Sequence, residues 1–217
     1  MAHIHTEPGQ VDHTVSFFVL RLDQGFGSEP RLTFHRHRKS GKLQMFGGHV
    51  ELNETPWGAL LHELTEESGF ERDQLAVLQP TRFQILELPG AVVHPQPLLS
   101  STGRYPFEDS HYHSDSLYVL TAREDPRGEP EEGESTEIHL LSRAELEAHP
   151  AEDIVPWCRE VGVTILERLY PLLLEQHYEE LPLTAFSGEL PEEAPISTGR
   201  ASSPSSPSGS STESSSK

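Results

Sequence analysis

The sequence predicts one α/β domain of the α+β type, followed by a polar tail. Segments typical of strands, apolar and rich in β-branched residues, are interleaved with a few segments of helical periodicity. This mixed order favours an α+β fold or an α/β sandwich. The apolar fraction of the 217-residue chain is 34%, which is low for a globular protein and indicates non-globular residues. Those residues gather at the end of the chain, so we expect the domain to cover residues 1–178.

The first two strands are predicted to form a hairpin. Residues 14–22 (TVSFFVLRL) are apolar and β-branched, as in a buried strand, and the glycine-rich turn DQGFG follows them. Residues 31–39 (RLTFHRHRK) alternate, which places His35, His37 and Lys39 on one side of a second strand. These three side chains are candidates for the wall of a substrate pocket.

The clearest element is a helix that follows Thr55. Thr55 can cap it, Pro56 suits its first position, and Gly69 can end it because glycine tolerates a left-handed conformation. Apolar residues recur at i, i+3, i+4 and i+7 along this helix, which predicts one buried stripe made of Trp57, Leu60, Leu61 and Leu64.

The second half of the domain predicts further strands and a late helical region. The strand candidates are residues 75–78, 82–88, 116–121 and 138–141. Ser142 can cap a short helix that runs to residue 148. Residues 153–178 are mostly helical, with Pro156 and Pro171 expected to begin or kink its parts.

Residues 179–217 are predicted to be a disordered tail. This stretch contains Phe186 as its one aromatic residue and is rich in Pro, Ser, Gly and Glu. Such a segment cannot bury enough apolar surface to offset the entropy lost on ordering.

The charge and the cysteine content exclude several classes of partner. The chain has 35 acidic and 16 basic residues, a formal net charge of −19, which repels a phosphate backbone and argues against long nucleic acid. No apolar run approaches the ~18 residues of a membrane span. Cys158 is the single cysteine, so an internal disulfide is impossible, and the first residues lack the layout of a signal peptide. We therefore expect a cytoplasmic protein.

Three acidic residues of the clearest helix form a candidate metal site. Glu63, Glu66 and Glu67 stand at i, i+3 and i+4 and project from one side. Carboxylates so close repel one another unless a cation lies among them. A hard divalent ion such as Mg²⁺ or Mn²⁺ would relieve the repulsion, and it suits diphosphate chemistry. Such a cluster can also be a simple solvated helix face.

The spacing around these acids resembles the Nudix box of the Nudix hydrolase family. Residues 48–70 (GHVELNETPWGALLHELTEESGF) match eight of the nine specified positions of that pattern, a coincidence on the order of one in 10⁵ by composition. The matching residues are Gly48, Glu54, Glu63, Leu64, Glu66, Glu67, Gly69 and Phe70. The resemblance implies a Nudix-like α/β/α sandwich with a mixed sheet.

The ninth position differs, because His62 stands where the family has Arg. In the family that Arg is thought to hold the glutamates through charged hydrogen bonds, a role for a planar and permanently charged group. One hypothesis is weaker activity, or activity that falls as His62 loses its proton. The alternative is an ordinary variant of a fully active enzyme.

The resemblance also implies roles for individual residues. Glu63, Glu66 and Glu67 would be the catalytic metal ligands, joined by the Gly47 carbonyl, while Glu54 and Gly48 would support the loop before the helix. Water would attack phosphorus, with the metal stabilising the charge on the diphosphate. The general base could be a box glutamate or an acid of a later loop, where the candidates are Glu134 and Glu137.

A second row of polar residues could also contact a ligand. His111, His113 and Asp115 alternate and would share one face of a strand. Such a row could bind a transition metal, or hydrogen-bond a base or a phosphate. It could equally be the exposed side of a half-buried sheet.

The function implied by the resemblance is a metal-dependent hydrolase that cleaves a phosphoanhydride bond in a nucleoside diphosphate linked to another moiety. The alternative is a degenerate Nudix domain that binds a nucleotide or metabolite as a non-catalytic sensor. A third reading, an isomerase of allylic diphosphates, would need a cysteine near the substrate, and Cys158 is far from the box in sequence. Specificity would reside in loops at residues 79–105 and 124–136. A homodimer is possible, since dimers are common among such proteins.

Overall fold

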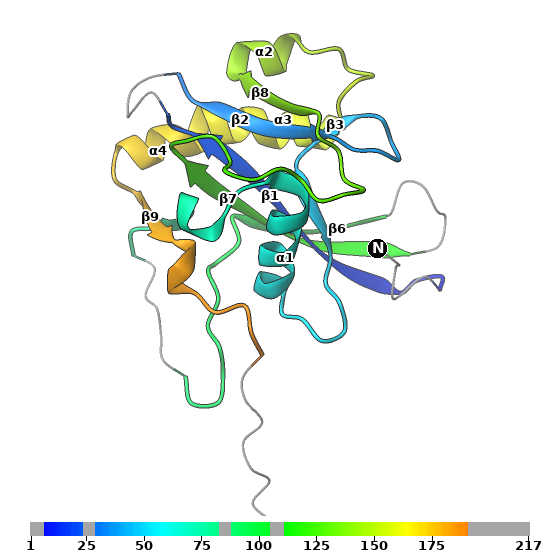
Figure 1. The fold of residues 1–217 in the computed structure, drawn as a ribbon, viewed down its shortest axis with the longest axis vertical. Coiled ribbons are helices and arrows are strands. Elements are labelled where there is room, and N and C mark those ends of the chain that lie inside the picture. Colours follow the sequence, from blue (N-terminus) through cyan, green and yellow to red (C-terminus); the bar gives the residue numbers. More distant parts are fainter. Residues whose placement is uncertain (1–6, 24–28, 83–87, 105–110, 191–217) are drawn as a thin grey trace, which may run out of the picture.

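The computed structural model describes residues 7–23, 29–82, 88–104 and 111–190 (Figure 1). Its strands, in chain order, are β1 (Val11–Arg21), β2 (Arg31–Arg36), β3 (Leu43–Gln44), β4 (Phe46–His49), β5 (Leu75–Pro80), β6 (Leu99–Arg104), β7 (Tyr112–Ala122), β8 (Ile138–Ser142) and β9 (Tyr178–Pro182). Its helices are α1 (Pro56–Ser68), α2 (Arg143–Ala148), α3 (Pro156–Thr164) and α4 (Tyr170–Leu174), with a π-helical segment (Ile165–Leu169) and short 3₁₀ segments at Arg72–Gln74 and Leu183–Ala185.

Strand β1 is at the centre of a mixed sheet. It pairs in parallel with β7 along its whole length, from Val11 opposite Tyr112 to Arg21 opposite Ala122. Its other edge pairs antiparallel with β4 near its beginning and with β2 near its end. The predicted hairpin of the first two long strands is therefore confirmed, and so is the α+β fold with a mixed sheet.

Helices cover both faces of this sheet. Successive side chains of β1 point to opposite faces, so Phe17 packs with the core under α1, whereas Phe18 packs with the core under α3 and α4. Trp57 of α1 contacts Tyr118 of β7 with ring centroids 5.4 Å apart. The result is the α/β/α sandwich that the box resemblance implied (Figure 1).

The fold continues past residue 178, the predicted end of the domain. Residues 178–182 form β9, which adds to the edge of β5, from Ala76 opposite Pro182 to Pro80 opposite Tyr178. Leu183 and Phe186 are then buried in the core under α1. These two apolar side chains stabilise the segment, although its overall composition is polar. Residues 191–217 of the predicted tail lie outside the described residues.

The late helical region also differs from the prediction. It begins at Pro156, as expected, and Pro171 stands at the beginning of α4, directly after the π-helical segment. The helices end at Leu174, and the chain re-enters the sheet at Tyr178. The predicted strand at 82–88 is not seen at residue 82, where β5 has already ended, and residues 83–87 lie outside the described residues. No helix among the described segments is long and apolar enough to cross a membrane.

Candidate active site

Helix α1 is placed by local signals at both of its ends. The Thr55 side chain accepts a 2.9 Å hydrogen bond from the Gly58 N–H, and Pro56 occupies the first turn. Gly69 ends the helix with φ of 70°, a left-handed conformation that favours glycine. These ends are the ones that the sequence predicts, and the predicted apolar stripe is buried.

The glutamates of α1 point in two directions. Glu63 and Glu67 are buried, with 2% and 7% of their surface exposed. The backbone N–H of Gly47, in β4, donates a 2.8 Å hydrogen bond to Glu67 Oε2. Glu66 is more exposed and meets His62. The structure therefore brings Glu63 and Glu67 under the glycines of β4, while Glu66 lies nearer the surface.

Burial makes the two inner carboxyls unusually weak acids. Desolvation, followed by repulsion from Glu66, raises the pKa of Glu63 to about 7. Desolvation raises the pKa of Glu67 to about 8, although the Gly47 N–H opposes it. Glu63 Oε1 is buried without a hydrogen-bond partner among the described residues. A buried carboxylate in this state is stabilised by a cation.

Gly47 is required by the close approach of β4 to β1. Its φ is 143°, and a Cβ at this position would lie 2.2 Å from the Val15 carbonyl oxygen and 2.7 Å from the Ser16 Cα. A side chain cannot fit there. The glycine lets the backbone of β4 lie flat on β1 and present its N–H to Glu67.

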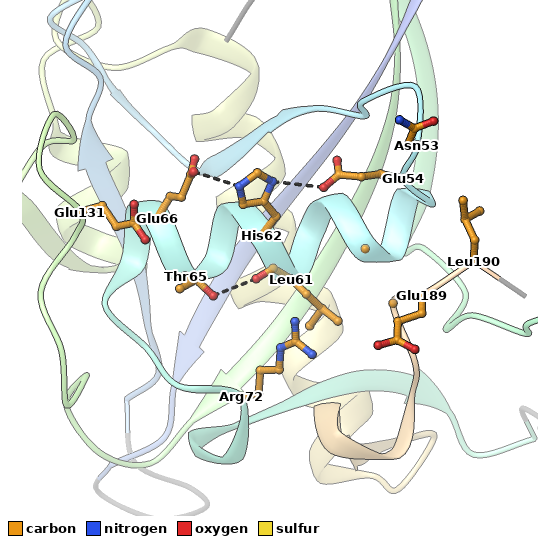
Figure 2. Close-up of a pocket in the computed structure, with 12 residues that line it drawn as sticks. Asn53, Glu54, Leu61, His62, Thr65, Glu66, Arg72, Glu131, Glu189 and Leu190 are labelled. Atoms are coloured by element: carbon orange, nitrogen blue, oxygen red, sulfur yellow. Dashed lines mark hydrogen bonds and ion pairs between the residues drawn. The ribbon is translucent and has the colours of Figure 1, made fainter. Parts of the chain in front are cut away.

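His62 connects the loop before α1 with the helix (Figure 2). Its Nδ1 lies 3.2 Å from Glu54 Oε1, and its Nε2 lies 2.9 Å from Glu66 Oε1. Glu54 Oε2 also accepts a hydrogen bond from the Glu51 N–H. Burial alone lowers the pKa of His62, but Glu66 and Glu54 outweigh it and raise that pKa above its ordinary value. When it is protonated, the imidazole can donate to both carboxylates, as a fork-shaped guanidinium can.

A hollow of about 630 Å³ adjoins this bridge. Its lining comes from four parts of the chain: the loop before α1 with the outer face of that helix, Arg72, Glu131 of the loop after β7, and the segment Gly188–Leu190 (Figure 2). Glu54, His62 and Glu66 are on its wall, whereas Glu63 and Glu67 are not. The hollow is therefore beside the inner carboxylates rather than over them.

The acidic loop after β7 packs against the end of α1. The Gly128 N–H donates to the Gly69 carbonyl at 3.0 Å, and the Glu131 N–H donates to the Glu66 carbonyl at 2.8 Å. The charge of Glu134 contributes to the raised pKa of both Glu63 and Glu67. Of the two predicted base candidates, Glu134 is therefore close to the inner carboxylates.

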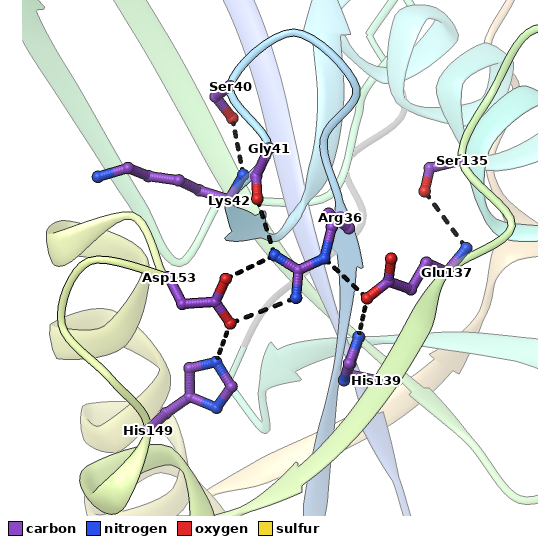
Figure 3. A network of polar contacts seen from close by, with 9 residues as sticks. All are labelled: Arg36, Ser40, Gly41, Lys42, Ser135, Glu137, His139, His149 and Asp153. Carbon is purple, nitrogen blue, oxygen red and sulfur yellow. Dashed lines mark hydrogen bonds and ion pairs between the residues drawn. The ribbon is translucent and has the colours of Figure 1, made fainter.

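Glu137, the other candidate, belongs to a separate ionic network (Figure 3). Its Oε1 accepts from Arg36 Nε at 2.7 Å and lies 2.9 Å from His139 Nε2. Arg36 also donates to Asp153 Oδ1 at 2.6 Å, which in turn meets His149. Arg36 is the largest cause that lowers the pKa of Glu137, and such a carboxylate is a weak base. The structure gives Glu137 a bracing role between β2 and β8.

The predicted row on the second strand is only partly formed. β2 ends at Arg36, so His37 and Lys39 stand in the following turn and do not continue a strand face. His35 is buried against Phe46, with ring centroids 5.0 Å apart, and 6.2 Å from the His37 ring. Desolvation lowers the pKa of His35 to about 4, which keeps the imidazole neutral. His35 and His37 thus lie on the α1 side of the sheet, and Lys39 lies on the surface.

The row at β7 is rearranged. Asp115 is hydrogen-bonded to β1: its carboxylate accepts from Thr14 Oγ1 at 2.8 Å and from Ser16 Oγ at 2.5 Å. Asp12 of β1 takes its place beside His111 and His113. Asp12 escaped the prediction because the parallel pairing of β1 with β7 is not visible in either segment alone. In the sequence, only the spacing of Asp12 and Thr14, two residues apart, indicates that polar side chains share this face of β1.

Cys158 is far from this chemistry. Its side chain is buried in α3 on the sheet face opposite α1, 3.6 Å from Met45 Sδ. Burial raises the pKa of its thiol to about 12, so the thiolate is not accessible. This position argues against the isomerase reading.

The loop at residues 79–105 contributes a strand to the sheet. Gln79 holds it through two hydrogen bonds with the Gln96 backbone, at 2.8 and 2.9 Å. β6 then pairs with the first half of β7, with Gly103 opposite His113. The described part of this loop thus ends beside the histidine row, while residue 105 lies outside the described residues.

The comparisons with known proteins agree with this geometry. A family model described as the NUDIX domain matches residues 12–160. A crystal structure of a NUDIX family hydrolase from Clostridium perfringens is 24% identical, covers 73% of this chain and 97% of its own, and superposes with a TM-score of 0.56. The NUDIX domain of Shewanella oneidensis NrtR, complexed with ADP ribose, is 11% identical over 74% of this chain and 89% of its own, with a TM-score of 0.50. No sequence among curated proteins matches significantly.

These likenesses to solved structures show the fold, and the family match covers more than half of the chain. The chain belongs to the Nudix family.

Proposed function

We propose that this protein is a metal-dependent hydrolase that cleaves a phosphoanhydride bond in a nucleoside diphosphate linked to another moiety. One observation carries the proposal: Glu63 and Glu67 are buried together at the glycine of β4, with one oxygen of Glu63 lacking a hydrogen-bond partner among the described residues. Burying two carboxylates costs stability unless a positive charge accompanies them. A structural role alone does not account for this arrangement.

The side chains at this place fit a divalent cation. They offer oxygen donors only, and two of the three carboxyls have raised pKa values, which are the consequence of burying like charges together. Mg²⁺, or Mn²⁺, prefers such hard oxygen ligands. Glu63, Glu66 and Glu67 would hold it, and the Gly47 carbonyl remains a proposed further ligand. When bound, the ion supplies charge stabilisation for the diphosphate and activation of water.

The protein's own residues would position the reaction. The Gly47 N–H orients the Glu67 carboxylate, and the apolar stripe of α1 fixes the helix against the sheet. The His62 bridge holds Glu54 and Glu66 at a constant separation. Glu134 is proposed as the base that accepts the proton of the attacking water, because its charge already acts on Glu63 and Glu67.

We place part of the substrate in the hollow beside α1 (Figure 2). Arg72 brings a guanidinium to its wall, which could pair with a phosphate or a carboxylate. His35, in β2, and His37, in the turn that follows it, are proposed to contact the substrate. A related NUDIX domain was crystallised with ADP ribose, a ligand of the proposed class. The overall charge of −19 still disfavours long nucleic acid as a substrate.

The test is product release from a panel of nucleoside diphosphate derivatives, with Mg²⁺ or with EDTA. The decisive variant is Glu67→Gln, and Glu160→Gln, an exposed glutamate of α3, is the matched control. We expect metal-dependent turnover in the wild type and in Glu160→Gln, and a loss of at least about 100-fold in Glu67→Gln.

Turnover that persists in EDTA, or in Glu67→Gln, would contradict the proposal. Absence of turnover across the panel, with a substrate-induced shift in melting temperature, would instead favour the non-catalytic sensor. A cytoplasmic location and a homodimer stay proposals beside this one, to be checked by fractionation and by light scattering.

A further inference from the structure

A second cluster of metal-binding side chains lies away from the glutamates of α1. Asp12 of β1, His111 just before β7, and His113 within β7 each offer one ligand atom, and the three atoms lie within 4.8 Å of one another. Asp12 and His113 are direct partners in the parallel pairing of the two strands. The cluster therefore arises from the register at the centre of the sheet, not from a flexible loop.

The surroundings favour a built site over a solvated row. Asp12 is 1% exposed and His111 is 0% exposed. A buried carboxylate with two imidazoles offers one oxygen and two nitrogen donors at one place, a set that suits a divalent ion.

His49 stands next to this cluster. Its Nε2 lies 3.6 Å from Asp12 Oδ2, and its ring meets that of His113 edge to face with centroids 5.1 Å apart. His49 belongs to β4, directly after Gly47 and Gly48. Strands β4, β1 and β7, with the residue just before β7, thus bring four potential ligands to one place.

We infer that Asp12, His111 and His113 form a binding site for a transition metal ion of the zinc type, with His49 in position to be a fourth ligand. Two or three imidazoles with one carboxylate suit Zn²⁺ rather than Mg²⁺, which prefers an all-oxygen shell. Donors around a tetrahedral zinc ion are about 3.4 Å apart, so small side-chain rotations from the observed 4.8 Å limit would close the site. The ion would tie the start of β1 to β7 and to the strand that enters the box.

This site is independent of the proposed hydrolysis. Its side chains belong to the Asp12 and Thr14 face of β1, opposite the face on which Phe17 packs against α1. Its test therefore measures metal binding and not turnover.

The experiment uses the full chain without a histidine tag, carrying Glu63→Gln and Glu67→Gln so that the box carboxylates cannot contribute. After incubation with Zn²⁺ and gel filtration, elemental analysis should find about one zinc per chain. Adding His113→Gln should reduce zinc to background, whereas His13→Gln, an exposed histidine on the other face of β1, should not. Co²⁺ in place of zinc should give the visible absorption of a tetrahedral site, lost in His113→Gln.

Two results would overturn the inference: no stoichiometric zinc in the parent protein, or full zinc retention in His113→Gln. Asp12→Asn is measured in parallel as a second variant of the site, and circular dichroism is recorded for each variant to check that it is folded. A further check uses the parent that carries Glu63→Gln and Glu67→Gln: Zn²⁺ should raise its melting temperature after chelation, and Mg²⁺ at equal concentration should raise it less. A larger shift with Mg²⁺ than with Zn²⁺ would count against the site.

Discussion

Gly47 and Glu67 are twenty residues apart, and the Gly47 N–H donates a 2.8 Å hydrogen bond to Glu67 Oε2. This bond joins the strand before the box to the last turn of the box helix. The bond orients the Glu67 carboxylate toward the protein interior and offsets part of the desolvation cost of burying it. The glycine is needed for two reasons, since its backbone also lies against β1.

Replacing Gly47 by alanine should therefore damage both stability and activity. The new Cβ would overlap the Val15 carbonyl, so β4 would have to move away from β1 and from Glu67. We expect a loss of at least about 2 kcal/mol in the free energy of unfolding, measured by urea denaturation. Gly103→Ala, where nothing lies within 4 Å of the added Cβ, is the control. Equal stability of the two variants would refute the argument.

Two substitutions of His62 should show how much its charge and its contacts each contribute to turnover. His62→Ala removes both contacts, to Glu54 and Glu66, and should reduce kcat by about tenfold. His62→Arg keeps a permanent charge, so it should match the wild type near pH 6 and exceed it at higher pH. The carboxylates hold the pKa of His62 above its ordinary value, so the wild-type imidazole loses its charge only at higher pH.

The ratio of His62→Arg activity to wild-type activity should consequently grow as the pH rises from 6 to 9. Turnover of His62→Arg that is equal to or below that of the wild type throughout this range would show that the histidine is an ordinary variant.

His35 should make the fold sensitive to acid. Its pKa is about 4 in the folded chain, against 6.5 for an exposed histidine, so the unfolded chain binds the proton first as the pH falls. This contribution to stability is complete above about pH 6.5 and declines toward pH 4, by up to about 3 kcal/mol. His35→Gln should flatten that decline in denaturation curves, while His13→Gln, exposed on β1, should leave it unchanged. Parallel curves for His35→Gln and the wild type would disprove this.

Truncation should locate the end of the folded domain. Removing residues 179–217 deletes most of β9 and exposes the apolar pocket that Leu183 and Phe186 fill. We expect this to cost several kcal/mol, on the order of two large core side chains. Removing only residues 191–217 should leave the melting temperature within about 2 °C of the full chain. Equal melting of both truncated forms would restore the boundary at residue 178.

Sequence reasoning succeeded where the signals are local. The cap at Thr55, the proline after it, the apolar stripe and Gly69 all act within a few residues, so α1 and the spacing of its glutamates could be predicted in full. The hairpin of β1 and β2 likewise follows from alternation and a glycine-rich turn.

The surroundings of a side chain could not be predicted where they depend on pairing between strands that are distant in the sequence. Asp12 meets His111 and His113 because of one particular register of β1 against β7, and Asp115 is occupied for the same reason. The alternating pattern of residues 31–39 predicts that Lys39 lies on a strand, but β2 ends at Arg36 and the backbone turns there. β9 was missed because its buried partners are provided by α1 and β5, far earlier in the chain.

The parallel pairing of β1 with β7 also has a consequence for biosynthesis. Thr14 and Asp115 are separated by 101 residues, and such distant contacts form late, after the entropy of closing a long loop has been overcome. A ribosome that has finished the box helix has not yet made Tyr118 or Phe186, the two rings on which Trp57 rests. The emerging polypeptide thus carries its glutamates well before it can bury them. Assembly of the candidate site is therefore expected only when nearly the entire chain has been synthesised.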